Sequence, residues 1–239
     1  DLTRACGKAP MFWADHPVHS ARVASLLQKN VMAIWWNYSH RLKVRDLKRL
    51  RKAGFRRILA APSTANYSMR FLTPRRQLVN VRKMAVCARR YRLNGVLNTV
   101  WTTTRYSQDA MYYGIAYSAF AARHPDGTLR AFNQQFARKV FGTGLTRDLA
   151  AFLNGWIEMD IHYRITLAVM KKERLGRNFL EGLEKACRVG ERILPLANKY
   201  IPARNRAIWE AMVLAAKTAW VCAAGALLMN GRKLNAARK

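Results

Sequence analysis

Four short apolar runs alternate with helical patterns in the first 110 residues, and each run ends in aromatic or polar side chains. The runs cover about residues 10–14, 31–36, 56–61 and 95–101. Between them, apolar residues recur every three or four positions, which is typical of helices with one buried face. Parallel strands need a connection long enough to hold a helix, so the alternation predicts a parallel sheet of four βα units.

The predicted helices follow the strands closely. They cover about residues 17–29, 42–53, 74–93 and 109–123. The third begins with Thr73 as its N-cap and Pro74 at its first helical position. Before it, the segment from Ser63 is expected to form a loop.

The segment from His124 to Gly127 has the composition of a turn and marks the best domain boundary. It predicts a βα region over residues 1–125 and a helical C-terminal region over residues 126–239. Further helices are expected at about 129–141, 146–174, 178–195 and 203–229. Asn178 and Glu181 have the spacing of a capping box, and Pro195 should kink or end that helix.

Four βα units leave both edges of a parallel sheet without partners. The α/β fold class predicted here is therefore the C-terminal half of a (β/α)₈ TIM barrel, followed by an all-helical region. A small four-stranded α/β sheet that stands alone is the alternative.

Chemistry in parallel sheets gathers where the strands end. Here those positions hold aromatic and polar residues that suit a sugar, whose C–H faces stack on indoles while its hydroxyls need polar partners. The candidate binding residues are Trp13, Asp15, Trp36, Asn37, Tyr67, Trp101 and Thr103.

Each candidate also has a purely structural interpretation. Trp13 would be a packed core residue, and Asp15 would begin the next helix. Asn37 and Tyr38 would be turn residues. Because neighbouring side chains on a strand point to opposite faces, at most one of Trp35 and Trp36 should reach a ligand.

The charge is strongly positive, with 43 Lys and Arg against 13 Asp and Glu and a net charge of +30. Residues 41–92 carry seventeen basic side chains and a single acid, Asp46. Such an excess attracts nucleic acids or other polyanions at low salt. No zinc-finger, RRM or KH signature accompanies it, so a solvated basic surface is the favoured explanation and nucleic-acid binding the alternative.

No cofactor or metal site is predicted. The four cysteines lack metal-ligand spacing, and no phosphate-binding glycine loop or nucleophile elbow is present. No signal peptide is recognisable, although the opening at Asp1 suggests a missing N-terminus that could have held one, so cytoplasmic and exported locations both stay open. The apolar run Thr218–Met229 has only twelve residues, too few for a membrane span.

Acidic residues are scarce where a glycosidase would need them. Residues 47–108 contain no carboxylate, and the βα region offers only Asp15, Asp46 and Asp109. A glycosidase needs two placed carboxyl groups, or one acid and a substrate group that acts as nucleophile. The required pair is therefore not expected in this chain.

Taken together, the strand ends resemble the second half of the catalytic barrel of glycoside hydrolase family 20, the β-N-acetylhexosaminidases and their bacterial relatives. The resemblance covers roughly residues 8–142 and implies that the four runs are strands five to eight. The matching pieces are Pro10–Asp15, Trp35–Tyr38, Leu59–Pro62 with Tyr67, Gly95–Trp101, and Phe136–Gly142 in the helix that trails the barrel.

The resemblance implies specific roles. Trp13, Trp36 (or Trp35) and Trp101 would box a terminal N-acetylhexosamine, and Tyr67 would bind its acetamido oxygen. In that family the acetamido group attacks the anomeric carbon, while an Asp–Glu pair at the end of strand four assists. That pair would lie upstream of this chain, in the missing N-terminal half of the barrel.

The chain departs from the family pattern at two positions. Thr103 stands where an acidic residue often grips sugar hydroxyls, and Met69 stands where an Asp often follows the tyrosine. Three functions follow as hypotheses: a glycoside hydrolase fragment whose partner is a carbohydrate substrate, a non-catalytic sugar-binding relative, and a basic nucleic-acid-binding protein.

Overall fold

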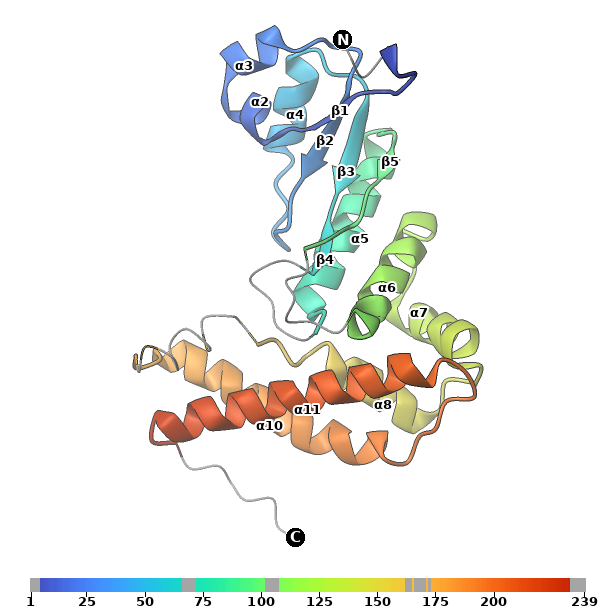
Figure 1. Cartoon of the computed structure of the whole chain (residues 1–239), viewed down its shortest axis with the longest axis vertical. Coiled ribbons are helices and arrows are strands. Elements are labelled where there is room, and N and C mark those ends of the chain that lie inside the picture. The colour runs from blue at the N-terminus through green and yellow to red at the C-terminus, as the bar shows by residue number, and fades with distance from the viewer. Residues whose placement is uncertain are drawn as a thin grey trace.

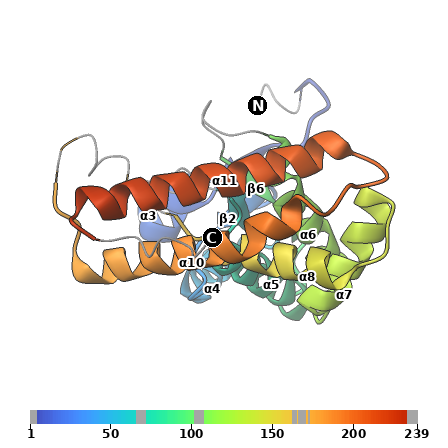
Figure 2. The ribbon, with the colours of Figure 1, turned by 90° about the horizontal axis from the view of Figure 1, so that it is seen from below.

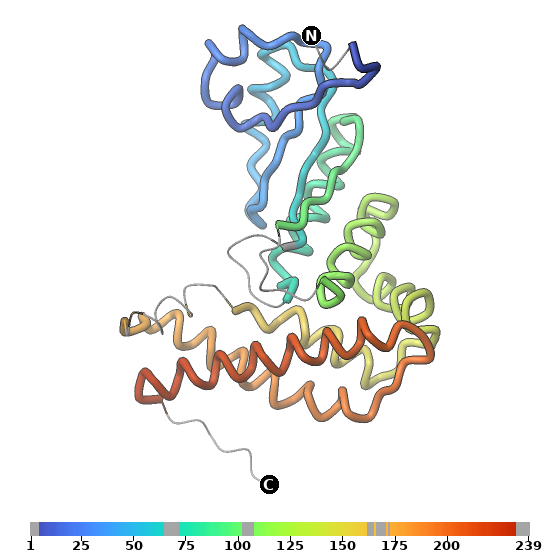
Figure 3. The backbone as a smooth tube through the Cα atoms, in the orientation of Figure 1, coloured from blue at the N-terminus to red at the C-terminus, as the bar shows by residue number. Residues whose placement is uncertain are grey.

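The computed structural model describes residues 5–65, 72–101, 108–161, 165, 171 and 173–232. Its upper part in Figure 1 is a parallel sheet with helices packed beside it, and its lower part is a layer of long helices. The protein is thus an α/β chain followed by a helical region. The tube in Figure 3 shows the chain passing from the first part to the second through α6 and α7.

Four parallel strands form one open sheet, in the order in which they occur in the sequence. They are β1 (Met11–Trp13), β2 (Met32–Trp36), β3 (Ile58–Ala61) and β5 (Gly95–Val96). Ile34 pairs with Trp13 on one side and with Leu59 on the other, and Leu59 pairs with Gly95. The predicted strand order and parallel direction are confirmed. β1 and β5 are the two edges.

Two further strands form a separate two-stranded sheet: one lies where a loop was expected, and the other is the second half of the strand predicted over 95–101, which is divided into two. β4 (Ser63–Ala65) pairs in parallel with β6 (Thr99–Val100). Pro62 separates β3 from β4 because it has no N–H for the ladder. Its carbonyl nevertheless accepts hydrogen bonds from both the backbone N and Oγ1 of Thr99, each at 2.9 Å. The loop prediction for residues 63–65 was wrong because pairing with β6 overrides their polar composition.

The helices between the strands are α2 (Asp15–His19), α3 (Ala21–Leu26), α4 (Arg45–Lys52) and α5 (Arg75–Arg90). The single helix predicted over 17–29 is divided at Ser20, whose backbone is extended and whose hydroxyl accepts a bond from Val23 N at 3.3 Å. Figure 1 shows α5 alongside β3, β4 and β5.

After residue 108, every regular element in the described part is helical. These elements are η1 (Asp109–Met111), α6 (Tyr112–Arg123), α7 (Leu129–Phe136), the π-helix η2 (Ala137–Phe141), α8 (Arg147–Trp156), α10 (Arg177–Ala197) and α11 (Arg206–Met229). Seen from below in Figure 2, α10 and α11 run side by side across the lower face, with α8 next to α10.

Two helix boundaries differ from the expected ones. α8 ends at Trp156 and not near Arg174, since Glu158 N turns back onto Gly155 O and the Ile157 carbonyl accepts a bond from Arg75 N. α10 is capped by Gly176, so Asn178 lies inside the helix and the predicted capping box is absent. The end of α8 depends on a tertiary contact with Arg75, so the local sequence pattern does not predict it.

Pro195 lies inside α10, which ends two residues later at Ala197. Proline removes one helical hydrogen bond and crowds the preceding turn. The expected end of the helix near Pro195 is confirmed.

Two buried clusters hold the structure together. The larger runs from Leu72 to Leu227 and joins α5 and α6 to the helical layer, while the smaller lies between the sheet, α4 and the other side of α5. α5 contributes Val81 to the larger cluster and Met84 to the smaller. The larger cluster therefore crosses residue 125, and the domain division there stays a prediction.

α11 is the one helix in the described part that is long and apolar enough to span a membrane by length and composition. It has 24 residues, twice the Thr218–Met229 run, and 44% of its most apolar window is buried against the protein. One such helix is weak support for a membrane span, because core helices of soluble proteins pass the same test. The absence of a span stays a prediction.

Two glycines of α10 should respond in opposite ways to replacement by alanine. A Cβ on Gly190 would lie 2.6 Å from Trp220 Cδ1 of α11, whereas a Cβ on Gly182 would meet no atom within 4 Å. We expect Gly190→Ala to destabilise the protein by about 1–3 kcal/mol through overpacking. Gly182→Ala should stabilise it by up to about 1 kcal/mol through helix propensity. Urea unfolding followed by circular dichroism measures both, and equal shifts would contradict the packing argument.

Candidate functional site

Four aromatic side chains form a continuous row at the carboxyl ends of the strands. We call Trp13, Trp36, Tyr38 and Trp101 the aromatic row. The Trp13 and Trp101 rings lie 5.9 Å apart between centroids, and those of Trp36 and Tyr38 lie 5.1 Å apart. Trp101 Nε1 donates a 2.5 Å hydrogen bond to Tyr38 Oη, which joins the two pairs.

The three indoles of the row remain open to solvent. Trp13 and Trp36 are each 40% exposed, and Trp101 is 45% exposed. Trp35, by contrast, is 2% exposed and belongs to the smaller buried cluster. Alternation along β2 therefore presents Trp36 and buries Trp35. Exposing the apolar surface of an indole to water is unfavourable, and a contiguous patch of exposed apolar side chains is typical of a binding surface.

A hollow of about 350 Å³ adjoins one end of the row. Trp36, Tyr38 and Asp15 line it, together with two residues that the sequence patterns did not single out for this place: His19 and Asp46. Asp15 and Asp46 come from the first turns of α2 and α4, both of which follow strand ends. The helix predicted over residues 42–53 includes Asp46, and the structure confirms that Asp46 is helical. The first turn of α4 nevertheless places its side chain in the lining of the hollow.

Asp46 is not free within the hollow. Its Oδ1 lies 3.5 Å from Arg49 Nη1 and 3.9 Å from Arg45 Nε. Asp15 has a weaker neighbour, with 3.8 Å between its carboxylate and His16 Nε2. Asp15 is thus the carboxylate of this hollow that is better placed to accept hydroxyl hydrogen bonds.

Asn37 acts as a turn residue in this structure. Its Oδ1 accepts a 2.9 Å hydrogen bond from Ser39 N, which closes an Asx turn. Asn80 of α5 holds the same turn from below, because its Nδ2 donates to Asn37 O at 2.8 Å and to Ser39 O at 2.9 Å. Tyr38 is the middle residue of this turn, so the turn fixes the position of Tyr38 in the aromatic row. Asn80 was not predicted to contribute to the site. A buried amide on the apolar face of a helix indicates such a role, because it needs hydrogen-bond partners.

Tyr67 and Thr103, the remaining predicted site residues, lie outside the described residues, as does Met69. Asp109, the third acid of the βα region, begins η1. The structure thus brings together Trp13, Trp36 and Trp101 and places Asp15 beside Trp36.

A second carboxylate pair lies elsewhere, at the start of α5. Glu158 bonds to both Arg75 and Lys185, and Asp160 lies 3.0 Å from Arg76. Burial raises the pKa of Glu158, but the hydrogen bonds from Lys185 and Arg75 outweigh it and bring that pKa below its ordinary value. Burial raises the pKa of Asp160 despite Arg76. The pairs of Arg75 with Glu158 and of Arg76 with Asp160 tie α5 to the helical region, and the pair of Lys185 with Glu158 adds α10 to this network.

The described residues contain no group of three or more His, Cys, Asp or Glu side chains that could hold a metal ion. Of the cysteines in this part of the chain, Cys87 and Cys187 are buried, Cys222 is partly buried and Cys6 is exposed. Burial raises the pKa of the Cys87 and Cys187 thiols, which keeps them protonated and unreactive near neutral pH.

The fold and the site define an open parallel α/β sheet with a row of exposed aromatic side chains at its strand ends. Comparison of the chain with protein-family models, with curated proteins and with solved structures finds no match.

Proposed function

We propose that the aromatic row is a carbohydrate-binding wall, and that the chain is the substrate-binding half of a glycoside hydrolase barrel related to family 20. The observation that carries the proposal is the contact between Trp13 and Trp101, whose rings come from opposite edges of the site and lie 5.9 Å apart. Two tilted indoles offer a sugar ring an apolar surface of the right size.

Polar groups beside the row supply what sugar hydroxyls need. The Tyr38 oxygen accepts from Trp101 Nε1, so the hydroxyl hydrogen of Tyr38 remains available to a ligand. Asp15 and His19 line the adjoining hollow. Binding sites for small molecules commonly combine an apolar surface with a few convergent polar groups.

The open sheet supports the second part of the proposal, which is that the chain is half of a barrel. β1 and β5 are edge strands, and parallel sheets are normally closed or covered. About eight strands close a barrel with a packed interior, so four further βα units would complete this one. Those units would bring the Asp–Glu pair that the substrate-assisted reaction requires.

Removing one indole of the row should weaken sugar binding. We expect Trp101→Ala to lower the affinity for N-acetylglucosamine or its β-1,4-linked disaccharide at least about tenfold, because an indole loses about 1.5–3 kcal/mol of apolar contact. Isothermal titration calorimetry or ligand-detected NMR measures the affinity. Tyr112→Ala is the matched control, since Tyr112 is also an aromatic residue with 43% exposure but lies on α6.

Other results would redirect the proposal. Equal effects of the Trp101 and Tyr112 variants would remove the aromatic row as the binding site. Tight, salt-sensitive binding of RNA or DNA without sugar binding would favour the nucleic-acid alternative, because contacts with phosphates weaken steeply as salt rises.

A further inference from the structure

A second hollow, of about 560 Å³, runs along the outer side of α5. It shares no residue with the aromatic row or with the hollow beside it. We call it the α5 groove. Its walls come from the segment before α4, from α5 itself, from α6 and from the ends of α7 and α8. The lining residues are Leu42, Val44, Arg75, Leu78, Val79, Arg82, Lys83, Val86, Cys87, Arg90, Tyr91, Tyr117, Leu129 and Ile157.

The floor of the α5 groove is apolar. Leu78, Tyr117 and Ile157 are buried beneath it, and Val79 and Val86 are half-buried along it. With 100° per residue, Val86 lies about 160° around the helix axis from Met84, which packs toward the sheet. Val86 therefore faces away from the sheet, whereas Leu42, Val44, Cys87 and Tyr91 of the groove belong to or pack against the smaller cluster.

The rim of the groove is cationic. Arg75 is paired with Glu158, but Arg82, Lys83 and Arg90 have no acidic partner among the described residues. Arg82 Nε donates to Pro125 O at 3.2 Å, Lys83 Nζ donates to His40 O at 2.8 Å, and the Arg90 guanidinium lies 5.9 Å from the Tyr91 ring. These contacts orient the three cations without neutralising them.

The shape and charge together define the occupant. The lining residues extend from the first residue of α5 to its last, which at 1.5 Å per residue is about 24 Å of helix. A flat bilayer surface cannot reach an apolar floor that lies between raised walls. A helix can, because its apolar ridge enters such a groove while its polar edges meet the rim.

We propose that the α5 groove binds an amphipathic helix of a partner protein whose flanks are acidic. Apolar side chains at positions i, i+3, i+4 and i+7 of that helix contact Val79 and Val86. Its Glu or Asp residues pair with Arg82, Lys83 and Arg90. The inference is independent of the sugar-binding proposal, because it depends on a different surface.

The test uses a synthetic 18-residue peptide with leucine at the i, i+3, i+4, i+7 positions and glutamate at most others. Its control is a peptide of the same composition in scrambled order, which has the same charge but no apolar face. We expect fluorescence anisotropy to show binding of the first at least about tenfold tighter than that of the second at 150 mM salt. Equal affinities would overturn the proposal, since the net charge of +30 alone would then explain them.

Two charge-reversal variants locate the site. Arg82→Glu with Arg90→Glu should lower the peptide affinity at least about tenfold, because like charges then face each other across the contact. Arg123→Glu with Arg138→Glu changes the net charge equally on α6 and η2, outside the groove, and should change the affinity less than about twofold. Circular dichroism checks that both variants keep the fold.

Equal losses from the two variants would contradict a defined groove. Binding of vesicles that contain anionic phospholipid, lost only in the Arg82/Arg90 variant and without peptide binding, would also overturn the proposal and assign the surface to lipid.

Discussion

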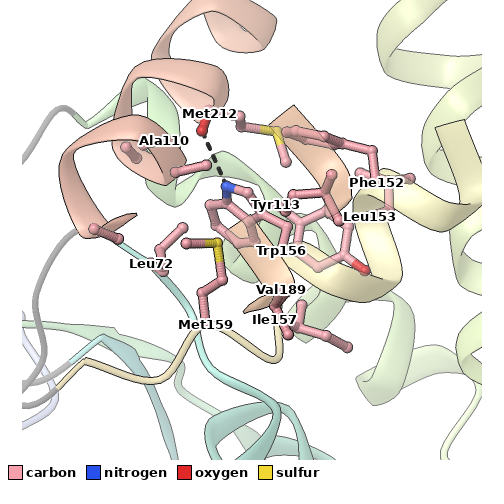
Figure 4. Close-up of a cluster of buried hydrophobic side chains, with 14 of the residues drawn as sticks. Leu72, Ala110, Tyr113, Phe152, Leu153, Trp156, Ile157, Met159, Val189 and Met212 are labelled. Carbon is pink, nitrogen blue, oxygen red and sulfur yellow. Dashed lines mark hydrogen bonds between the residues drawn. The ribbon is translucent and has the colours of Figure 1, made fainter. Parts of the chain in front are cut away.

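Trp156→Ala should be among the most destabilising single substitutions in this protein, lowering the free energy of unfolding by about 3–5 kcal/mol. Trp156, the last residue of α8, is fully buried in the larger cluster, where it contacts α11 and lies near the segment that leads into α5 (Figure 4). Its ring lies 5.5 Å from that of Tyr113, and its Nε1 donates a 3.1 Å hydrogen bond to the Met212 carbonyl. Alanine would leave a large cavity at the point where the sheet region meets the helical layer.

The midpoint of thermal or urea unfolding measures this effect. A loss of this size is a large fraction of the roughly 5–15 kcal/mol that stabilises most domains, and it corresponds to a midpoint lower by roughly 10 °C. Trp36→Ala is the matched control, because the same side chain is removed from a position with 40% exposure, and its cost should be below about 1 kcal/mol. Similar midpoints for the two variants would contradict the packing around Trp156.

The second large effect concerns hydrolysis. We expect this chain alone to release no product from an aryl N-acetylglucosaminide above the rate in buffer. General acid catalysis is typically worth about 10²–10⁴-fold, and the proposed mechanism places the acid on another βα unit. If the proposal is right, supplying the four further βα units that it requires, on the same chain or on a second one, should raise the rate by at least that factor.

Two carboxylates of this chain could contradict the expected lack of hydrolysis, because either could act as the catalytic acid. Asp15 and Asp46 line one hollow beside Trp36. If the chain alone is active and Asp15→Asn or Asp46→Asn abolishes the activity, the catalytic acid lies within that hollow. Asp126→Asn is the control, since Asp126 is an exposed carboxylate that pairs with Arg89.

Much of the sheet region could be predicted from the sequence because its strands are short apolar runs separated by amphipathic helices. Buried parallel strands need no alternation, so these runs indicate strand position directly. β4 could not be predicted in this way. Its residues, Ser63–Ala65, are polar or small, and only their pairing with β6 makes them a strand. The end of α8 depends similarly on a contact between Ile157 and Arg75, 82 positions apart in sequence.

The site shows the same division. Trp13, Trp36 and Trp101 could be predicted to meet because strand ends of a parallel sheet lie at one edge. The contributions of Asp46 and Asn80 depend on how α4 and α5 are rotated about their axes, which tertiary packing sets. The hydrogen bond between Trp101 and Tyr38 depends on a turn that Asn80 holds.

The position of α5 between the two buried clusters has a consequence for folding. Val81 belongs to one cluster and Met84 to the other, so a single rigid helix is part of both hydrophobic cores. Neither core can lose α5 without exposing the apolar face of the other. The sheet region and the helical layer should therefore unfold cooperatively, as one two-state transition, even though they look like separate bodies in outline.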